Sequence, residues 1–297
     1  DKDTAALLRK RNKKEREDHA AGQLPLSASL QKQLDEILRG WNELNRLPEH
    51  TPDEIEAKKA RYLAFTQSKD SWLLHQIASI PIAQFYLPKV ADNLQKFVTD
   101  ATYRRYWKGE MSPQGQATAE AWALAERKRF FHWFLEFPEI MERGGFDCIL
   151  GNPPYLGGKK LTGTYGEAFL ELVKHLYFPA GGLSDLVVYF LRRMAQLARP
   201  QGFYALISTN TISQGDAREG GMGFLHNNGH SIVFANRSVK WPGRAVLEVS
   251  LISLHRGDWI GRRVLNGSIV SHISPLLTSD APESEPQRLV ENDSRSF

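Results

Sequence analysis

The chain of 297 residues contains a single cysteine, Cys148, and no long apolar run. One cysteine cannot form a disulfide within the chain, which favours a reducing compartment such as the cytoplasm. The lack of an apolar stretch of roughly 18 residues argues against a membrane-spanning helix. The first residues, DKDTAALLRKRNKKERED, are charged throughout and do not resemble a secretory signal. We therefore expect a cytoplasmic protein with no membrane partner.

Neither sign of charge dominates the composition. The chain has 38 Lys and Arg residues against 34 Asp and Glu residues, for a formal net charge of +4. This small excess permits a polyanionic partner such as nucleic acid but does not require one. An apolar fraction of 41% is typical of a globular protein, and the length suggests one large or two ordinary domains.

The first third of the chain has the pattern of helices. Residues 29–47 place leucine, isoleucine and tryptophan at helical spacing. A helix start follows, because Thr51 can act as a cap, Pro52 suits the first helical position and Glu54 can complete a capping box. We predict that residues 1–115 form a helical region or insertion.

The pattern changes to alternating strands and helices after the pair Gly144-Gly145. A buried strand is expected in FDCIL, and a helix in SDLVVYFLRRMAQLA with Ser184 as its N-cap. Arg199–Gly202 has the composition of a turn. Later strands are expected in FYALIST, SIVFANRSV and AVLEVSLISLHR, all rich in β-branched or aromatic residues.

This order of elements predicts an α/β fold with a mostly parallel sheet and a late antiparallel strand. A helix over residues 116–137 is expected to lead into the sheet. We expect residues 116–260 to form one functional part of the chain. Residues 261–297 are polar and are predicted to be a loose tail or the start of a following domain.

The most informative motif is the corner Asn152-Pro153-Pro154-Tyr155, directly after the first predicted strand. Ligands of open α/β sheets bind beyond the carboxyl ends of the strands, where this corner lies. Asn152 offers a side-chain oxygen and Pro153 a backbone oxygen, while Pro154 has no N–H group to compete for them. Tyr155 adds a flat aromatic ring.

Two fixed oxygen acceptors suit one planar NH₂ group. An exocyclic amine or amide is a poor nucleophile, because its lone pair is delocalised into the π system. Accepting both hydrogens localises that pair, and the stabilisation is greatest as charge develops in the transition state. A base inside a duplex cannot reach such a corner, so a DNA substrate would have to be flipped out.

The stretch GFDCILGNPPY resembles motif IV of methyltransferases that act on amino groups and use S-adenosylmethionine. The wider region, about residues 130–257, resembles motifs IV to VIII of large bacterial adenine-specific DNA methyltransferases. These include the type IIG restriction–modification enzymes and related phage-defence methyltransferases. The resemblance implies a partial Rossmann-like methyltransferase sheet, N6-adenine methylation, and double-stranded DNA with a flipped adenine as partner.

The resemblance also implies roles for individual residues. Asn152 and Pro153 would accept the hydrogens of the adenine amine, and Tyr155 would stack on the flipped base. Trp241 would form the second wall of the base pocket. Asp185 would line the adenosine side of the cofactor. Residues 116–260 would then be the catalytic half of a methyltransferase domain.

The segment Gly157–Lys160 is predicted to be a loop. Gly157 and Lys159 would contact phosphates beside the base pocket, and the alternative is an ordinary solvated loop.

The sequence departs from the family in one respect. No glycine-rich loop of the kind that binds the methionine end of S-adenosylmethionine precedes residue 144. Since the chain also begins with Asp1, we expect a piece of a longer enzyme. The same polypeptide would add the cofactor loop, a target-recognition domain and, in some such enzymes, a nuclease. The strand at residues 146–150 would then be an exposed edge unless residues 1–115 or another chain covered it.

Each assignment has a structural alternative. The proline corner is also compatible with a strand-ending turn, Trp241 with a packed turn residue, and Asp185 with a carboxylate in the first turn of a helix. The segment HNNGH has no Cys or carboxylate at ligand spacing, and no metal is expected. The alternative functions are methylation of RNA guanine or protein glutamine, or a non-catalytic fragment.

Overall fold

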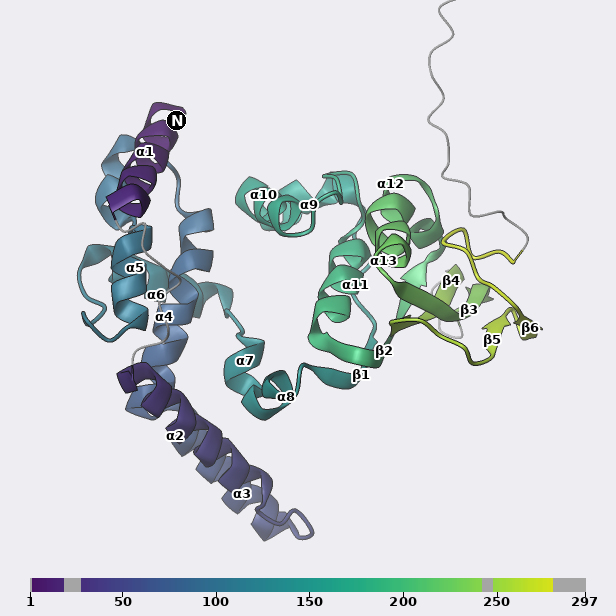
Figure 1. Cartoon of the computed structure of the whole chain (residues 1–297), viewed down its shortest axis with the longest axis horizontal. Coiled ribbons are helices and arrows are strands. Elements are labelled where there is room, and N and C mark those ends of the chain that lie inside the picture. Colours follow the sequence, from purple (N-terminus) through teal and green to yellow (C-terminus); the bar gives the residue numbers. More distant parts are fainter. Residues whose placement is uncertain (1, 19–27, 242–247, 280–297) are drawn as a thin grey trace, which may run out of the picture. The chain divides into compact units, whose positions relative to one another are not determined.

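The computed structural model describes residues 2–18, 28–241 and 248–279. The chain forms two compact units, a helical unit, Asp1–Arg143, and a sheet unit, Gly144–Phe297 (Figure 1). The division therefore falls later than residue 115, where the sequence suggested a boundary. The reason is that α6 (Gln116–Lys128) packs against α4 (Lys69–Tyr86).

The helical unit contains the helices expected in the first third of the chain. Their bounds are α1 Lys2–Asp18, α2 Ala28–Asn45, α3 Pro52–Thr66, α4 Lys69–Tyr86, α5 Asp100–Trp107, α6 Gln116–Lys128, α7 Trp133–Glu136 and α8 Pro138–Glu142, with a 3-10 helix, η1, at Ala91–Lys96. The expected helix over 116–137 is wrong beyond Lys128. Arg129 has a positive φ of 53° and ends α6 in the left-handed conformation, which a continuous helix excludes.

The start of α3 confirms the capping prediction. The Thr51 hydroxyl accepts a hydrogen bond from the Glu54 backbone N–H at 3.3 Å. The Glu54 carboxylate accepts one from the Thr51 N–H at 3.0 Å, and Pro52 occupies the first turn. This motif was predictable because all its partners lie within four residues.

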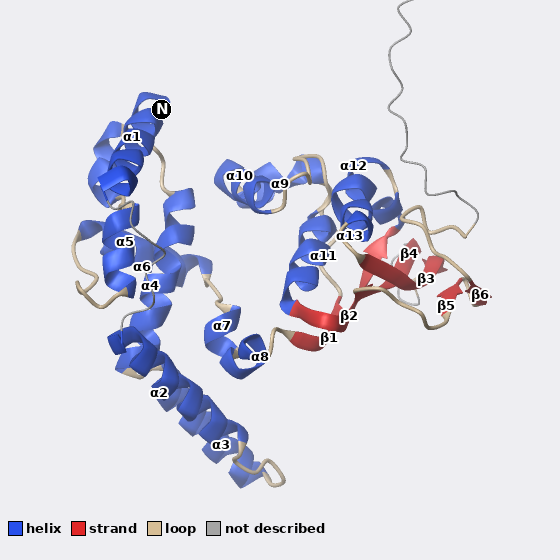
Figure 2. Ribbon diagram, in the orientation of Figure 1, coloured by secondary structure: helices blue, strands red, loops and turns tan. Residues whose placement is uncertain are grey.

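The sheet unit contains a six-stranded sheet in the order β1-β2-β4-β3-β5-β6 (Figure 2). The strands are β1 Phe146–Gly151, β2 Ala198–Thr209, β3 His230–Lys240, β4 Glu248–Arg256, β5 Arg263–Leu265 and β6 Ser268–Val270. Because β1–β2 and β3–β5 pair in parallel and the other pairs are antiparallel, β1, β2, β3 and β5 share one direction. The predicted α/β fold with a mostly parallel sheet is confirmed, and β4 is the late antiparallel strand.

Helices of the sheet unit pack on one face of the sheet. They are α9 Gly158–Tyr165, α10 Glu167–Leu176, α11 Leu186–Leu197, α12 Gly215–Arg218 and α13 Phe224–Asn227, with a 3-10 helix, η2, at Asn210–Ser213 and a π-helix, η3, at Glu219–Gly223. The buried core joins α11, through Val187 and Leu191, to Tyr204 and Leu206 of β2. No helix among the described residues is long and apolar enough to span a membrane.

The predicted turn at Arg199–Gly202 lies within β2 and forms a bulge. The register with β1 skips between the pairs Phe146↔Ala198 and Cys148↔Phe203. Between these pairs β1 advances two residues and β2 advances five, and Gln201 within the bulged segment has a positive φ of 63°. A Cβ on Gly202 would lie 2.9 Å from the carbonyl oxygens of Arg199 and Phe146, so only glycine fits without a shift. The turn composition was correct, but pairing with β1 continues the strand through it.

Strand β1 stands at the edge of the sheet, with β2 as its neighbour among the described residues. The expectation that it is a buried strand is wrong for this chain. Leu150 is 78% exposed and Cys148 is also exposed, whereas Ile149 packs against the core under α11. We expected this strand to be an exposed apolar edge unless another segment covered it, and within the described part of the chain it is exposed.

Arg192 fastens the helices of the sheet unit to each other. It lies on α11 with only 7% of its surface exposed. Its Nη1 donates to the Gly220 carbonyl at 2.9 Å and its Nη2 to the Phe178 carbonyl at 3.2 Å. The guanidinium lies 3.5 Å over the centre of the Phe224 ring. One buried side chain thus joins three separate segments.

The exposed edge can be tested with the single thiol. A maleimide should modify Cys148 in the folded 297-residue chain at nearly the rate measured in guanidinium, because no described element covers it. Mass spectrometry follows the reaction, and Cys148→Ser is the unlabelled control. Strong protection in the folded state would mean that another strand or a second copy covers β1.

The Arg192 contacts predict a large stability effect. Arg192→Met should lower the free energy of unfolding of the sheet unit by about 2 to 4 kcal/mol, because the buried Gly220 carbonyl and the partly buried Phe178 carbonyl lose their donor. Urea denaturation followed by circular dichroism measures this. The neighbouring Arg193→Met is a matched control, since Arg193 is exposed. Equal effects of the two substitutions would contradict the role given to Arg192.

Candidate functional site

The candidate site begins where β1 ends. Gly151 is the last residue of β1 and pairs with Leu206, and the proline corner follows without regular structure. The prolines differ in environment, because Pro153 is buried and Pro154 is exposed. Asn152 is exposed, so its amide is not turned into the core of the unit. A catalytic interpretation of this residue requires that exposure.

The Tyr155 hydroxyl donates a hydrogen bond to the Asn152 Oδ1 at 2.9 Å. Burial of the ring raises the Tyr155 pKa, so the phenol keeps its proton and acts as the donor. An amide oxygen has two lone pairs, and this bond uses one of them. The arrangement holds the Asn152 oxygen and the Tyr155 ring together at the end of the strand.

An open hollow of about 390 Å³ adjoins Asn152. It lies on the sheet face opposite α11 and is lined mainly by apolar side chains, among them Leu150, Ile207, Leu251 and Phe234. A surface of this kind accepts a planar apolar group or a covering element of the protein.

The residues after the corner differ from the prediction. Gly157–Lys160 was expected to be a loop, but α9 begins at Gly158, so Lys159 and Lys160 lie in its first turn. Both lysines are exposed. The helix N-terminus carries a partial positive charge, and the two lysines add to it. This turn therefore attracts an anion. Gly157 is the N-cap of the helix, and as a glycine it has no side chain to make a capping hydrogen bond.

Asp185 is the N-cap of α11, and the prediction that Ser184 caps this helix is wrong. The Asp185 Oδ1 accepts from the Val187 N–H at 3.2 Å, and the backbone N–H groups of Leu156 and Leu186 lie near enough to the carboxylate to act on its pKa. Burial raises the Asp185 pKa, and the three backbone N–H groups partly oppose that rise. Ser184 is buried, and its Oγ has no hydrogen-bond partner among the described residues.

Trp241 leaves the sheet at the same end as Asn152, where the parallel strands finish. It directly follows β3, which runs parallel to β1 and β2, and it is half-buried. Two strands separate β1 from β3, so the two exits lie roughly 14 Å apart across the sheet. A planar ligand and an aromatic ring fit within that span.

Asn210 is a polar residue of this edge that the sequence did not single out. It follows β2, and its Oδ1 accepts from the Ser250 Oγ at 2.7 Å while its Nδ2 donates to the Ser238 Oγ at 2.9 Å. These bonds join the ends of β2, β3 and β4. The available signal was an Asn directly after a predicted strand, as at Asn152.

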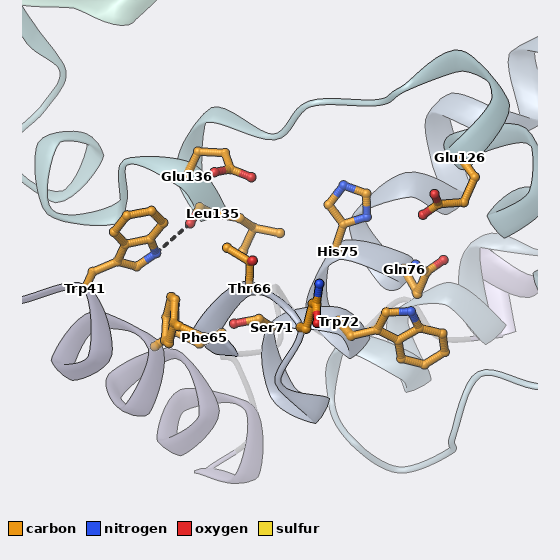
Figure 3. A pocket seen from close by; sticks show the side chains of 12 residues that line it. Trp41, Phe65, Thr66, Ser71, Trp72, His75, Gln76, Glu126, Leu135 and Glu136 are labelled. Atoms are coloured by element: carbon orange, nitrogen blue, oxygen red, sulfur yellow. Dashed lines mark hydrogen bonds between the residues drawn. The ribbon is translucent and has the colours of Figure 1, made fainter. Parts of the chain in front are cut away.

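The helical unit has a separate pocket of about 320 Å³, and none of the predicted site residues lines it (Figure 3). Trp41, Phe65 and Trp72 supply aromatic walls, with His75 and Glu126 beside them. The Trp41 indole N–H donates to the Leu135 carbonyl at 2.9 Å, which closes one side.

His132 is buried beside His75, with the two ring centroids 4.9 Å apart, and its Nε2 hydrogen-bonds the Ser79 hydroxyl at 2.9 Å. Burial, with His75 nearby, lowers the His132 pKa to about 4, so the ring is neutral near pH 7. These features belong to the packing of the helical unit.

Comparison with known families gives a match that covers parts of both the helical unit and the sheet unit. The sequence model described as Eco57I restriction-modification methylase matches residues 53–236, which is more than half of the chain. The chain belongs to this family. The match begins in α3, so part of the helical unit lies within the matched residues. Trp241 lies just beyond the matched residues.

Two curated proteins are similar to parts of this Eco57I-type chain. A putative type II restriction enzyme and methyltransferase of Methanocaldococcus jannaschii is 26% identical over 137 residues, covering 43% of this chain and 11% of the relative. DNA methyltransferase A of Bacillus subtilis is 24% identical over 221 residues, covering 68% of this chain and 25% of the relative. The chain thus spans a quarter or less of the length of either relative.

Among solved structures, the type IIL restriction-modification enzyme MmeI in complex with DNA matches 86% of this chain and 41% of its own. The sequence identity is 15% and the TM-score is 0.37. A TM-score this low does not establish a shared architecture.

Proposed function

We propose that this chain carries the base-binding half of the active site of a DNA methyltransferase that acts on the N6 amine of adenine. The carrying observation is the exposed Asn152 oxygen beside the Tyr155 ring, at the carboxyl end of a strand. Membership of a restriction-modification methylase family and similarity to a named DNA methyltransferase support DNA as the substrate.

The chemistry of the proposed site follows from its acceptors. The Asn152 Oδ1 and the Pro153 carbonyl oxygen would each accept one hydrogen of the amine, which raises electron density on the nitrogen as it becomes tetrahedral. Neither proline has an N–H that would occupy these oxygens. The Tyr155 hydroxyl holds the Asn152 oxygen in the absence of base, and the amine hydrogen would share or replace that bond.

The planar surfaces and charges around the corner suit a flipped base. The Tyr155 ring would stack on one face of the adenine, and Trp241, at the same edge of the sheet, would cover the other. Lys159 in the exposed first turn of α9 would contact the phosphates that flank the flipped nucleotide. Its charge carries no sequence information, so it would contribute to affinity and position.

The methyl donor in this proposal is S-adenosylmethionine, but the residues of this chain do not complete a site for it. No glycine-rich loop precedes β1 in the sequence, and among the described residues no strand pairs with the outer side of β1. Asp185 is engaged as the N-cap of α11. The cofactor loop, like target recognition, would lie in further domains of the same polypeptide.

Substitution of Asn152 tests the function. In the longest natural form of the polypeptide, Asn152→Ala should lower the rate of methyl transfer at least about 100-fold, because one acceptor of the amine is lost. DNA binding by gel shift should change little, and Asn42→Ala, in an exposed position of α2, is the control.

Mass spectrometry of DNA, RNA and protein incubated with the enzyme identifies the product. N6-methyladenine in DNA is expected. Methylation confined to RNA guanine or protein glutamine would replace this proposal, and turnover unchanged by Asn152→Ala would refute it.

The ring of Tyr155 should matter more than its hydroxyl. Tyr155→Phe keeps the stacking surface and should retain most of the methylation rate, whereas Tyr155→Ala should weaken capture of the flipped base by about 10- to 100-fold. Fluorescence of 2-aminopurine at the target position reports base flipping. A Phe variant as impaired as the Ala variant would show that the hydroxyl, and not the ring, is the essential group.

A further inference from the structure

The corner that holds Asn152 and Tyr155 needs an external anchor. Residues 152–157 belong to no helix or strand, and two of them are prolines without an N–H. Stiff X-Pro geometry fixes the path of the chain locally but does not attach it to the rest of the unit. Leu156, directly after Tyr155, is the point at which that attachment occurs.

Two backbone groups of Leu156 face the start of α11. The Leu186 N–H donates to the Leu156 carbonyl at 2.9 Å. The Leu156 N–H lies near the Asp185 carboxylate, whose negative charge it stabilises. The same carboxylate accepts from the Val187 N–H at 3.2 Å and thereby caps α11. A single side chain therefore fixes both the first turn of the helix and the end of the corner.

Close packing supports this attachment on either side. Gly158 is buried, and a Cβ there would lie 2.4 Å from the backbone carbonyl of Leu183. Leu156 packs against the core of the sheet unit, together with the fully buried Leu161 of α9. The segment after Tyr155 thus lies against the residues that precede α11, without room for an intervening side chain.

We propose that Asp185 is a positioning residue that locks the corner to α11 and so holds the Tyr155 ring and the Asn152 oxygen in place for the base. This inference rests on the proposed function for its catalytic meaning, although the anchor itself does not. It gives Asp185 a different role from the cofactor contact that the family resemblance implied. A carboxylate is needed because it accepts from several N–H groups at once and has no hydrogen to oppose them.

The substitution Asp185→Asn separates the two tasks of this residue. Asparagine is a good N-cap, so α11 should stay folded. Its amide NH₂ cannot face the Leu156 N–H, because both are donors, so the side-chain part of the anchor is lost and only the backbone bond between Leu186 and Leu156 remains. Asp185→Ser is a second variant that also caps α11 but is too short to serve both segments. Asp216→Asn, at an exposed first-turn carboxylate of α12, is the matched control.

Hydrogen exchange in the 297-residue chain tests the anchor directly. A peptide covering residues 152–158 contains two prolines and so reports mainly on the amides around Leu156. In both Asp185 variants its slowest amide should exchange about 10- to 100-fold faster, while α11 peptides keep their protection. The Asp216→Asn chain should match the parent. Unchanged exchange in this peptide, with α11 folded, would overturn the proposal.

Kinetics of the longest natural form of the polypeptide test the catalytic meaning. Asp185→Asn should lower kcat by about 10- to 100-fold because the corner is misplaced, and leave the KM for S-adenosylmethionine unchanged. A raised KM with unchanged kcat would instead assign Asp185 to the cofactor and refute the positioning role. Failure of the proposed function is distinguishable, because Asn152→Ala would then leave turnover intact while the exchange result still stood.

Discussion

Parallel pairing of β1 with β2 is the constraint on which the site depends. It sets the direction of β1, and so delivers Asn152 at the edge where β2 and β3 also end. If β1 were antiparallel to β2, the corner would lie at the opposite end of the strands, away from Asn210 and Trp241. The pairing also brings the corner beside the start of α11, because α11 leads directly into β2.

Rigidity at the corner comes from two different sources. The prolines restrict backbone angles and remove donors, which keeps the oxygen acceptors open for a ligand. The attachment to α11 supplies what prolines cannot, which is a fixed position relative to the sheet. The stiff proline corner and its attachment to α11 through Leu156 are therefore complementary, and neither alone would place Tyr155.

The sequence predicted features whose partners are near in the chain. The capping box at Thr51, the strand at 146–150 and the exposed corner all depend on local residue types. Prediction from the sequence failed where contacts with distant segments determine the local conformation. The turn at Arg199–Gly202 became a bulge because β1 pairs beside it. The choice of Ser184 over Asp185 as the cap was a local error of one residue, since the capping bond goes from Val187 to Asp185. The left-handed Arg129 gave no signal in its residue type.

The two prolines have a second consequence, which concerns aggregation of the protein through its edge strand. An exposed edge strand is a template on which foreign chains can add by backbone pairing. A chain that pairs with β1 cannot extend its ladder through Pro153 and Pro154, because these residues offer no N–H groups. The proline corner thus also limits the length of any amyloid-like pairing along this strand.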